Sequence, residues 1–157
     1  MSKNIGEFNV GDSISALNID RVSRKSLKRY AKASGDYNPI HINEDFAQES
    51  GLPNVIAHGM LIMSYLGKIL TNTFPQSTLV NFSSQFISMT HINDRLSCSG
   101  EIIKKTTDTT NNTSYDILLK VINESGEKKI SGKATIILRS SISVSYTHLT
   151  LPTKRIV

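Results

Sequence analysis

The chain has 157 residues, which is enough for one domain with a single hydrophobic core but not comfortably for two. Hydrophobic residues make up 38% and charged residues 20%, as in an ordinary folded protein, and no apolar run approaches the roughly 20 residues that span a bilayer. A single cysteine, Cys98, excludes an intrachain disulfide and a thiolate metal cluster, and the first residues lack the apolar stretch of a secretory signal. We therefore expect a cytoplasmic protein without a membrane partner.

The formal net charge is +5, but its distribution is uneven. Lys154 and Arg155 lie in a C-terminal segment without acidic residues, and without these two charges the net charge is +3. Six other basic residues lie close together: Arg21, Arg24, Lys25, Lys28, Arg29 and Lys32. This cluster is consistent with a solvated helix surface or with a surface that attracts an anionic ligand, such as a nucleotide-bearing thioester. Aromatic residues are few and do not alternate with the basic ones, so no nucleic-acid partner is expected.

The first half of the chain predicts one strand and two helices. Loose alternation of apolar and polar residues indicates a strand from Asp12 to Asp20. Ser23 can cap a helix from Arg24 to Ser34, which Gly35 would end in a left-handed conformation. Asn43 can cap a second, short helix that runs through Glu49 and ends at Gly51.

A longer helix is expected over 59–72, because its apolar residues cover nearly the whole circumference: Met60, Leu61, Ile62, Met63, Leu66, Ile69 and Leu70. A helix that is apolar all round is expected to be buried. Gly67 lies in its middle, where glycine costs about 1 kcal/mol relative to alanine, and we attribute it to close packing of the backbone.

The remainder reads as strands over 79–90, 94–106, 113–123 and 127–140, separated by segments rich in turn-forming residues. Successive hairpins imply an antiparallel sheet, so the predicted fold class is α+β, with a curved sheet wrapped around the long buried helix. The open edges of such a sheet favour a homodimer. We assign residues 1–143 to this domain. The segment 144–157 has no obvious partner; it resembles translated adapter sequence or a flexible terminus, and it is left out of functional reasoning.

The best candidates for catalytic residues, Asp36 and His41, lie in the loop between the first two predicted helices. Pro39 disfavours a helical Asn38, so the first helix cannot continue through this segment. A carboxylate beside an imidazole forms an acid–base pair, and both groups could bind one water molecule. The alternative is an ion pair or capping contact that merely braces the loop.

Gly59, at the start of the long helix, is a second candidate. Its N–H has no acceptor within the helix and lies at the positive end of the helix dipole, where a thioester carbonyl could rest as enolate charge develops. The alternative is that Gly59 simply begins the helix and binds no substrate.

The run Ser34-Gly35-Asp36-Tyr37-Asn38-Pro39-Ile40-His41, followed by Phe46-Ala47 and by Ala57-His58-Gly59-Met60-Leu61, closely resembles the hydratase motif of the MaoC-like family of (R)-specific enoyl-CoA hydratases. The resemblance extends from about Asp12 to Arg139. It implies a hot-dog fold and a homodimer or higher oligomer with active sites near the subunit interface. It also implies reversible hydration of a trans-2-enoyl thioester, carried on coenzyme A or on acyl carrier protein, to the (3R)-3-hydroxyacyl thioester.

The resemblance also implies roles for individual residues. Asp36 and His41 match the catalytic pair that activates water and protonates the α-carbon, Asn38 matches a residue that supports the site, and Gly59 matches the amide of the oxyanion hole. No metal or redox cofactor is implied. Some family members carry serine at the position of Gly67, a difference that concerns the shape of the acyl pocket.

Other residues and other functions remain as alternatives. We expect His58 to be a hydrogen-bonded histidine that helps to place Gly59 rather than a third catalytic group or a metal ligand, and Cys98 to be a packed side chain rather than a nucleophile. The same fold could serve a thioesterase that cleaves acyl-CoA, or a protein that binds acyl thioesters without catalysis.

Overall fold

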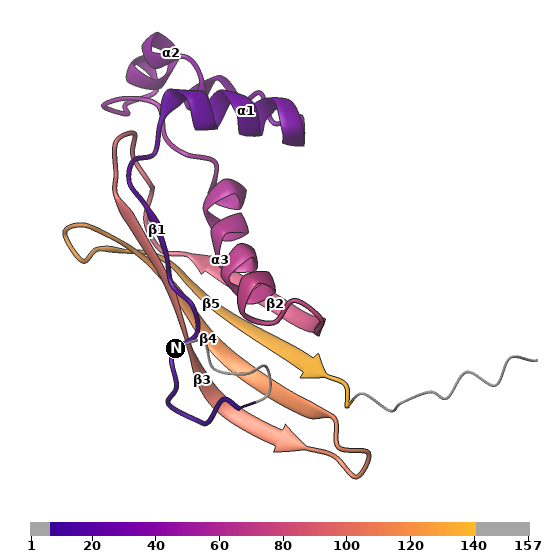
Figure 1. Cartoon of the computed structure of the whole chain (residues 1–157). Helices are drawn as coiled ribbons and strands as arrows, with labels where there is room; N and C mark the ends of the chain where they lie inside the picture. Colours follow the sequence, from indigo (N-terminus) through magenta and orange to yellow (C-terminus); the bar gives the residue numbers. More distant parts are fainter. Residues whose placement is uncertain (1–6, 141–157) are drawn as a thin grey trace, which may run out of the picture.

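The computed structural model describes residues 7–140, so the predicted domain boundary at 143 and the segment 144–157 lie outside the described residues. One long helix, α3 (Gly59–Thr73), packs against a five-stranded antiparallel sheet (Figure 1). The strands are β1 (Leu17–Ile19), β2 (Thr78–Phe86), β3 (Leu96–Thr107), β4 (Thr113–Asn123) and β5 (Lys128–Leu138), in the spatial order β1-β3-β4-β5-β2. The predicted α+β class and antiparallel sheet are confirmed. Within residues 7–140, none of the helices combines the length and hydrophobicity that crossing a bilayer requires.

The two predicted N-terminal helices form where their caps indicated. Helix α1 (Arg24–Ser34) begins with a reciprocal capping box, in which Ser23 and Ser26 each bind the other's backbone N–H through the side-chain hydroxyl. It ends at Gly35, whose φ of 77° is left-handed. Helix α2 (Glu44–Glu49) is capped by the side chain of Asn43. Both helices lie beyond one end of the sheet (Figure 1).

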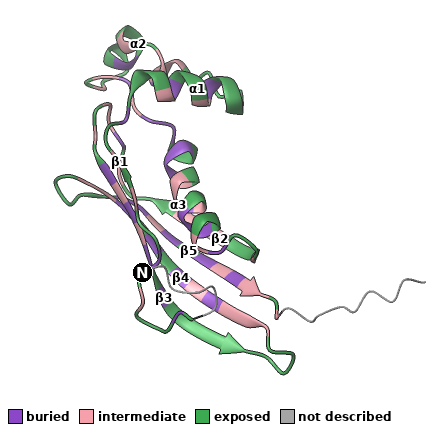
Figure 2. Ribbon diagram, in the orientation of Figure 1, coloured by how far each residue is buried: buried purple, intermediate pink, exposed green. Residues whose placement is uncertain are grey.

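The hydrophobic core lies between α3 and one face of the sheet. Alternate residues of the central strands are buried, which is the period of two that a sheet with one covered face requires (Figure 2). Strand β4, for example, buries Tyr115, Ile117, Leu119 and Val121. From the helix, the inward residues are Leu61, Ile62, Leu66, Ile69 and Leu70.

The prediction that α3 is buried around its whole circumference is wrong for the single chain. Met60 is 56% exposed, and Ser64 and Lys68 are exposed on the same helix. The reason is that the sheet covers α3 from one side only. The explanation offered for Gly67 is also wrong, because a β-carbon added there would lie 3.6 Å from the Phe82 ring, an ordinary van der Waals distance.

Two strand predictions need correction at their ends. Strand β1 is limited to three residues, and the earlier part of the predicted strand contributes only an isolated bridge between Ser13 and Glu101. Strand β2 stops at Phe86 rather than continuing to Thr90. The chain leaves the sheet there. Residues 87–94 run from the start of β5, where the Ser88 hydroxyl donates to the Lys128 carbonyl, to the segment before α3, where the N–H of Ala57 donates to the Thr90 carbonyl.

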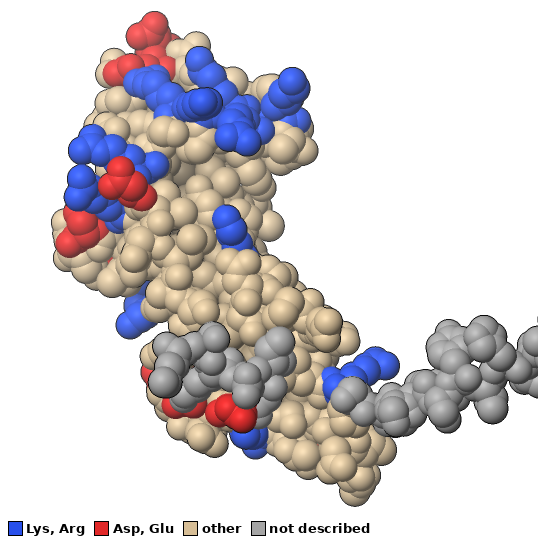
Figure 3. Space-filling model, viewed as in Figure 1, with Lys and Arg blue, Asp and Glu red and all other residues tan. Residues whose placement is uncertain are grey.

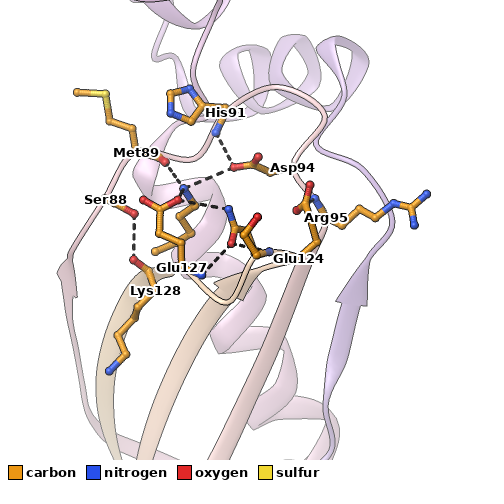
Figure 4. Close-up of polar contacts among 11 residues, drawn as sticks. Ser88, Met89, His91, Asp94, Arg95, Glu124, Glu127 and Lys128 are labelled. Carbon is orange, nitrogen blue, oxygen red and sulfur yellow. Dashed lines mark hydrogen bonds and ion pairs between the residues drawn. The ribbon is translucent and has the colours of Figure 1, made fainter.

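Lys129, whose side chain is buried, holds the segment 87–94 in place. Its ammonium group donates to the carbonyl of Met89 (2.7 Å) and to Glu127 Oε2 (2.7 Å), and it lies 3.7 Å from Asp94 Oδ2. Its backbone carbonyl accepts the N–H of Ile87 (2.9 Å). Figure 4 shows these contacts: Met89 and Asp94 approach the ammonium group from the loop, and Glu127 approaches it from the β4–β5 hairpin. Pairing with two carboxylates offsets the cost of burying the charge, and the segment is thereby held as one wall of the pocket described below.

Candidate active site

The loop after α1 is shaped by two short-range hydrogen bonds from its own side chains. Asp36 Oδ1 accepts the backbone N–H of Asn38, and Asn38 Oδ1 accepts the backbone N–H of Ile40, both at 3.2 Å. Asn38 thereby caps the single-turn 3₁₀ helix η1 (Pro39–His41). Asn38 thus supports His41 through the backbone.

His41 is held by one main-chain contact in a defined orientation. The side chain is 9% exposed, and its Nδ1 lies 2.7 Å from the carbonyl oxygen of Ile56. A carbonyl can only accept a hydrogen bond, so Nδ1 carries the proton. In the neutral imidazole Nε2 is then an unprotonated acceptor, and this is the atom that faces Asp36.

The carboxylate of Asp36 lies at a distance that suits a shared water molecule. Its Oδ2 is 4.0 Å from His41 Nε2, too far for a direct hydrogen bond, and the Asp36 side chain is about half exposed. A water molecule that donates one hydrogen to each of two acceptors holds them about 4 to 4.5 Å apart at ordinary bond lengths. The geometry therefore allows one water molecule to bind both groups.

His58 supports this pair from behind. Its Nε2 donates to the backbone carbonyl of Asp36 at 3.0 Å, and its ring stacks on that of His41 with centroids 3.9 Å apart. The ring of Tyr30, on the inner side of α1, packs edge-on against it at 4.9 Å. The predicted hydrogen-bonded histidine is confirmed, but its bond holds Asp36, and it makes no side-chain cap on α3.

Burial favours the neutral form of His58. Desolvation lowers the pKa of His58 below its ordinary value of 6.5, and the nearby His41 lowers it further, although the hydrogen bond to Asp36 opposes both effects. Its Nδ1 is buried without a hydrogen-bond partner among the described residues. Protonation would place a charge against the His41 ring and away from solvent.

A pocket of about 310 Å³ lies beside the pair. His41 and Gly59 both line it, and apolar side chains form most of its wall, among them Ile62, Phe86 and Ile130. Gly59 begins α3, so helix geometry leaves its N–H without an intrahelical acceptor. A β-carbon at this position would lie 2.9 Å from the Phe86 ring, so the ring would have to shift to admit any other residue.

Asp36, His41 and His58 each offer a potential metal ligand within 4.8 Å of the others. The hydrogen bonds argue against joint coordination. His58 Nε2 carries the proton that it donates to Asp36, and the remaining nitrogen, Nδ1, is enclosed by the protein. A metal ion would have to break the contact that holds the loop at Asp36, so these residues fit a water-binding pair better than a metal centre.

The structure therefore brings His41 and Gly59 to one pocket, places Asp36 beside His41, and gives Asn38 a capping contact within the same loop. Cys98 is fully buried, and burial raises the pKa of its thiol to about 12, so it is not a nucleophile. The sequence did not indicate the carbonyl of Ile56, which is a backbone group, nor the ring of Phe86, which lies 27 positions beyond Gly59. Neither has a signature in a single sequence.

Comparison with known proteins places these residues in a family. The MaoC like domain family matches residues 7–124. A mitochondrial 3-hydroxyacyl-[acyl-carrier-protein] dehydratase of Arabidopsis thaliana is 33% identical over 87 residues, which cover 55% of this chain and 51% of that protein. An (R)-specific enoyl-CoA hydratase of Rhodospirillum rubrum is 32% identical over 80 residues, which cover 50% of this chain and 56% of that protein. The chain thus spans about half the length of these relatives.

Among solved structures, an unliganded R-hydratase from Pseudomonas aeruginosa has a TM-score of 0.76 at 22% identity, covering 87% of this chain and 85% of its own. This likeness shows that the fold is shared and confirms the expected hot-dog architecture. The family match extends over well more than half of the chain, and it includes the loop with Asp36 and His41 and the start of α3. By fold and by sequence, the chain belongs to the MaoC-like domain family.

Proposed function

We propose that the protein is a hydro-lyase that reversibly adds water to a trans-2-enoyl thioester and forms a (3R)-3-hydroxyacyl thioester. The observation that carries the proposal is the 4.0 Å separation of Asp36 Oδ2 and His41 Nε2, with His41 Nδ1 held by the Ile56 carbonyl. The names of the relatives support it, since one is a dehydratase and another a hydratase of acyl thioesters.

In this proposal Asp36 and His41 bind one water molecule through its two hydrogens. As the oxygen attacks C3 of the enoyl group, one member of the pair takes a proton and the electron pair of the double bond moves toward the thioester carbonyl. The proton then passes to C2, the α-carbon. One hydrogen of the water remains in the new hydroxyl group and the other ends on C2, so the pair returns to its starting state.

Gly59 would stabilise the charge that develops on the thioester oxygen. Its N–H belongs to the first turn of α3, where unpaired amides and the helix dipole favour negative charge. The apolar wall formed by Ile62, Phe86 and Ile130 would face the acyl chain. Asn38 would keep η1 and therefore His41 in place.

We also propose that the protein works as a homodimer. Among the described strands, β2 lies at the edge of the sheet and pairs with β5 alone, and its residues Leu79, Val80 and Phe86 are about half exposed. The helix α3 exposes Met60 as well. A second copy of the chain would cover these apolar residues.

The activity is tested by the loss of enoyl-thioester absorbance when purified protein is added to crotonyl-CoA and longer enoyl-CoAs. We expect Asp36→Asn and His41→Ala each to lower kcat by about 10²–10⁴, because each removes one proton-transfer partner. Tyr37→Phe is the matched control in the same loop, because its side chain is exposed. Near-normal turnover in both catalytic variants would refute the roles assigned here.

The same preparation separates the alternatives. Release of free thiol from a saturated acyl-CoA would indicate a thioesterase instead. Binding of acyl-CoA without hydration of any enoyl substrate would indicate a protein without catalytic activity.

A further inference from the structure

A row of basic side chains covers the outer side of α1, next to the candidate active site. Between residues 21 and 32 the chain has six basic residues and no acidic one, and all six are exposed. At 3.6 residues per turn, Lys25, Lys28, Arg29 and Lys32 fall within about 100° of one another around the helix axis. Figure 3 shows these basic side chains gathered over α1.

The stability of the helix does not explain this arrangement. Among residues 7–140, only Arg24 of the six forms an ion pair, with Glu44. Like charges four residues apart, such as Lys25 with Arg29 and Lys28 with Lys32, repel each other along the helix. The first turn has no acidic residue, although the helix dipole favours one there.

The opposite side of α1 faces the catalytic residues. Leu27 and Ala31 are buried, and the Tyr30 ring contacts His58. The helix ends at Gly35, directly before Asp36. A partner bound to the outer side of α1 would therefore lie beside the catalytic loop.

The extent of the row favours a protein partner over a nucleotide. Residues 25–32 span about 10 Å of helix axis at 1.5 Å per residue, and the four basic side chains are exposed along it. The phosphates of a coenzyme A molecule would be held better by cations that converge on one point. A row of separate cations instead matches a row of carboxylates on an acidic protein surface.

We propose that the outer side of α1 is the docking surface for an acidic acyl carrier protein that delivers the thioester to the site. Lys25, Lys28, Arg29 and Lys32 contact its carboxylates, and the acyl group reaches the pocket past the loop at Asp36. Glu44 of α2, which pairs with Arg24, limits the surface on one side. This inference rests on the proposed function and selects the carrier for it.

The test compares one acyl group on two carriers, trans-2-hexenoyl-CoA and trans-2-hexenoyl acyl carrier protein. In the variant Lys28→Glu/Arg29→Glu we expect kcat/KM to fall at least about tenfold for the carrier protein substrate and less than about twofold for the CoA substrate. The control variant Lys120→Glu/Lys133→Glu has the same charge change at exposed positions of β4 and β5, and we expect it to alter neither value. An equal loss with both substrates, or no loss with the carrier protein substrate, overturns the proposal.

A second measurement is independent of turnover. Binding of holo acyl carrier protein to the wild-type protein and to both variants is followed by fluorescence anisotropy. Binding that weakens about tenfold or more only in Lys28→Glu/Arg29→Glu supports the docking surface, even if neither substrate is hydrated and the proposed function fails. Absence of binding to the wild-type protein, or equal binding by all three proteins, overturns it.

Discussion

The two stacked histidines can do different chemistry because each donates to a backbone carbonyl through a different ring nitrogen. His41 donates through Nδ1 to Ile56, which leaves Nε2 toward Asp36. His58 donates through Nε2 to Asp36 itself, and its Nδ1 is enclosed. The two imidazoles are alike in the sequence, and the main-chain acceptors distinguish the one that can exchange protons from the one that supports it.

The buried state of His58 predicts a pH-dependent stability. Burial lowers the pKa of His58 below the unfolded value of about 6.5, so its contribution to the free energy of unfolding is complete above that pH. This contribution is lost as the pH falls toward the pKa of His58 in the folded protein. We expect urea unfolding to show a smaller decrease in stability between pH 7.5 and 5.5 for His58→Gln than for the wild-type protein. His91→Gln is the control. The same decrease in His58→Gln and the wild type would contradict the assignment.

Close contact between Gly59 and Phe86 predicts a steric requirement at the pocket. The substitution Gly59→Ala keeps the backbone N–H but places a β-carbon 2.9 Å from the ring, so the ring or the start of α3 must move. This shift would displace the Phe86 ring from the pocket wall, and we expect kcat/KM for crotonyl-CoA to fall by about tenfold or more. The double variant Gly59→Ala/Phe86→Leu should recover part of the loss. Unchanged kinetics in the single variant would show that this contact does not shape the site.

Helix α3 contains one glycine in close contact with a ring and a second glycine with room for a β-carbon. Gly67 has room for a β-carbon and lies within regular helix, where alanine is more stable by about 0.5–1 kcal/mol. We expect Gly67→Ala to raise the free energy of unfolding by that amount. Gly126→Ala, in the β4–β5 hairpin at a φ of 79°, should lower it by about 1 kcal/mol or more, because a side chain strains this conformation. Destabilisation by Gly67→Ala, measured by urea unfolding, would reveal a packing role that the distances do not indicate.

The elements that the sequence predicted well are those with local signals. Ser23 and Gly35 mark the ends of α1, and Asn43 marks the start of α2, because caps act within a few residues. The end of β2 was predicted too late because its cause is distant. Residues 87–94 leave the sheet and are held in place by hydrogen bonds with Lys129, which lies more than thirty positions further along the chain.

The exposed apolar edge of the whole molecule predicts self-association. We expect sedimentation velocity to give about twice the mass of the 17.3 kDa chain. Leu79→Lys/Val80→Lys adds charge to the edge strand β2 and should shift the protein toward monomers. The matched control Ile103→Lys/Leu118→Lys changes exposed apolar residues of the inner strands β3 and β4 and should leave the mass unchanged. A monomeric wild-type protein at micromolar concentration would refute the proposed dimer.

The sequence by itself determined the α+β class, the helix caps, the order of the hairpins and the identity of Asp36, His41, Asn38 and Gly59 as candidates. These features depend on period, capping and a motif that is nearly contiguous. The tertiary structure decided which nitrogen of His41 is free, which group His58 holds, and that Phe86 approaches Gly59. Each of these contacts joins segments 15 or more residues apart, and their geometry is set by packing that a single sequence does not display.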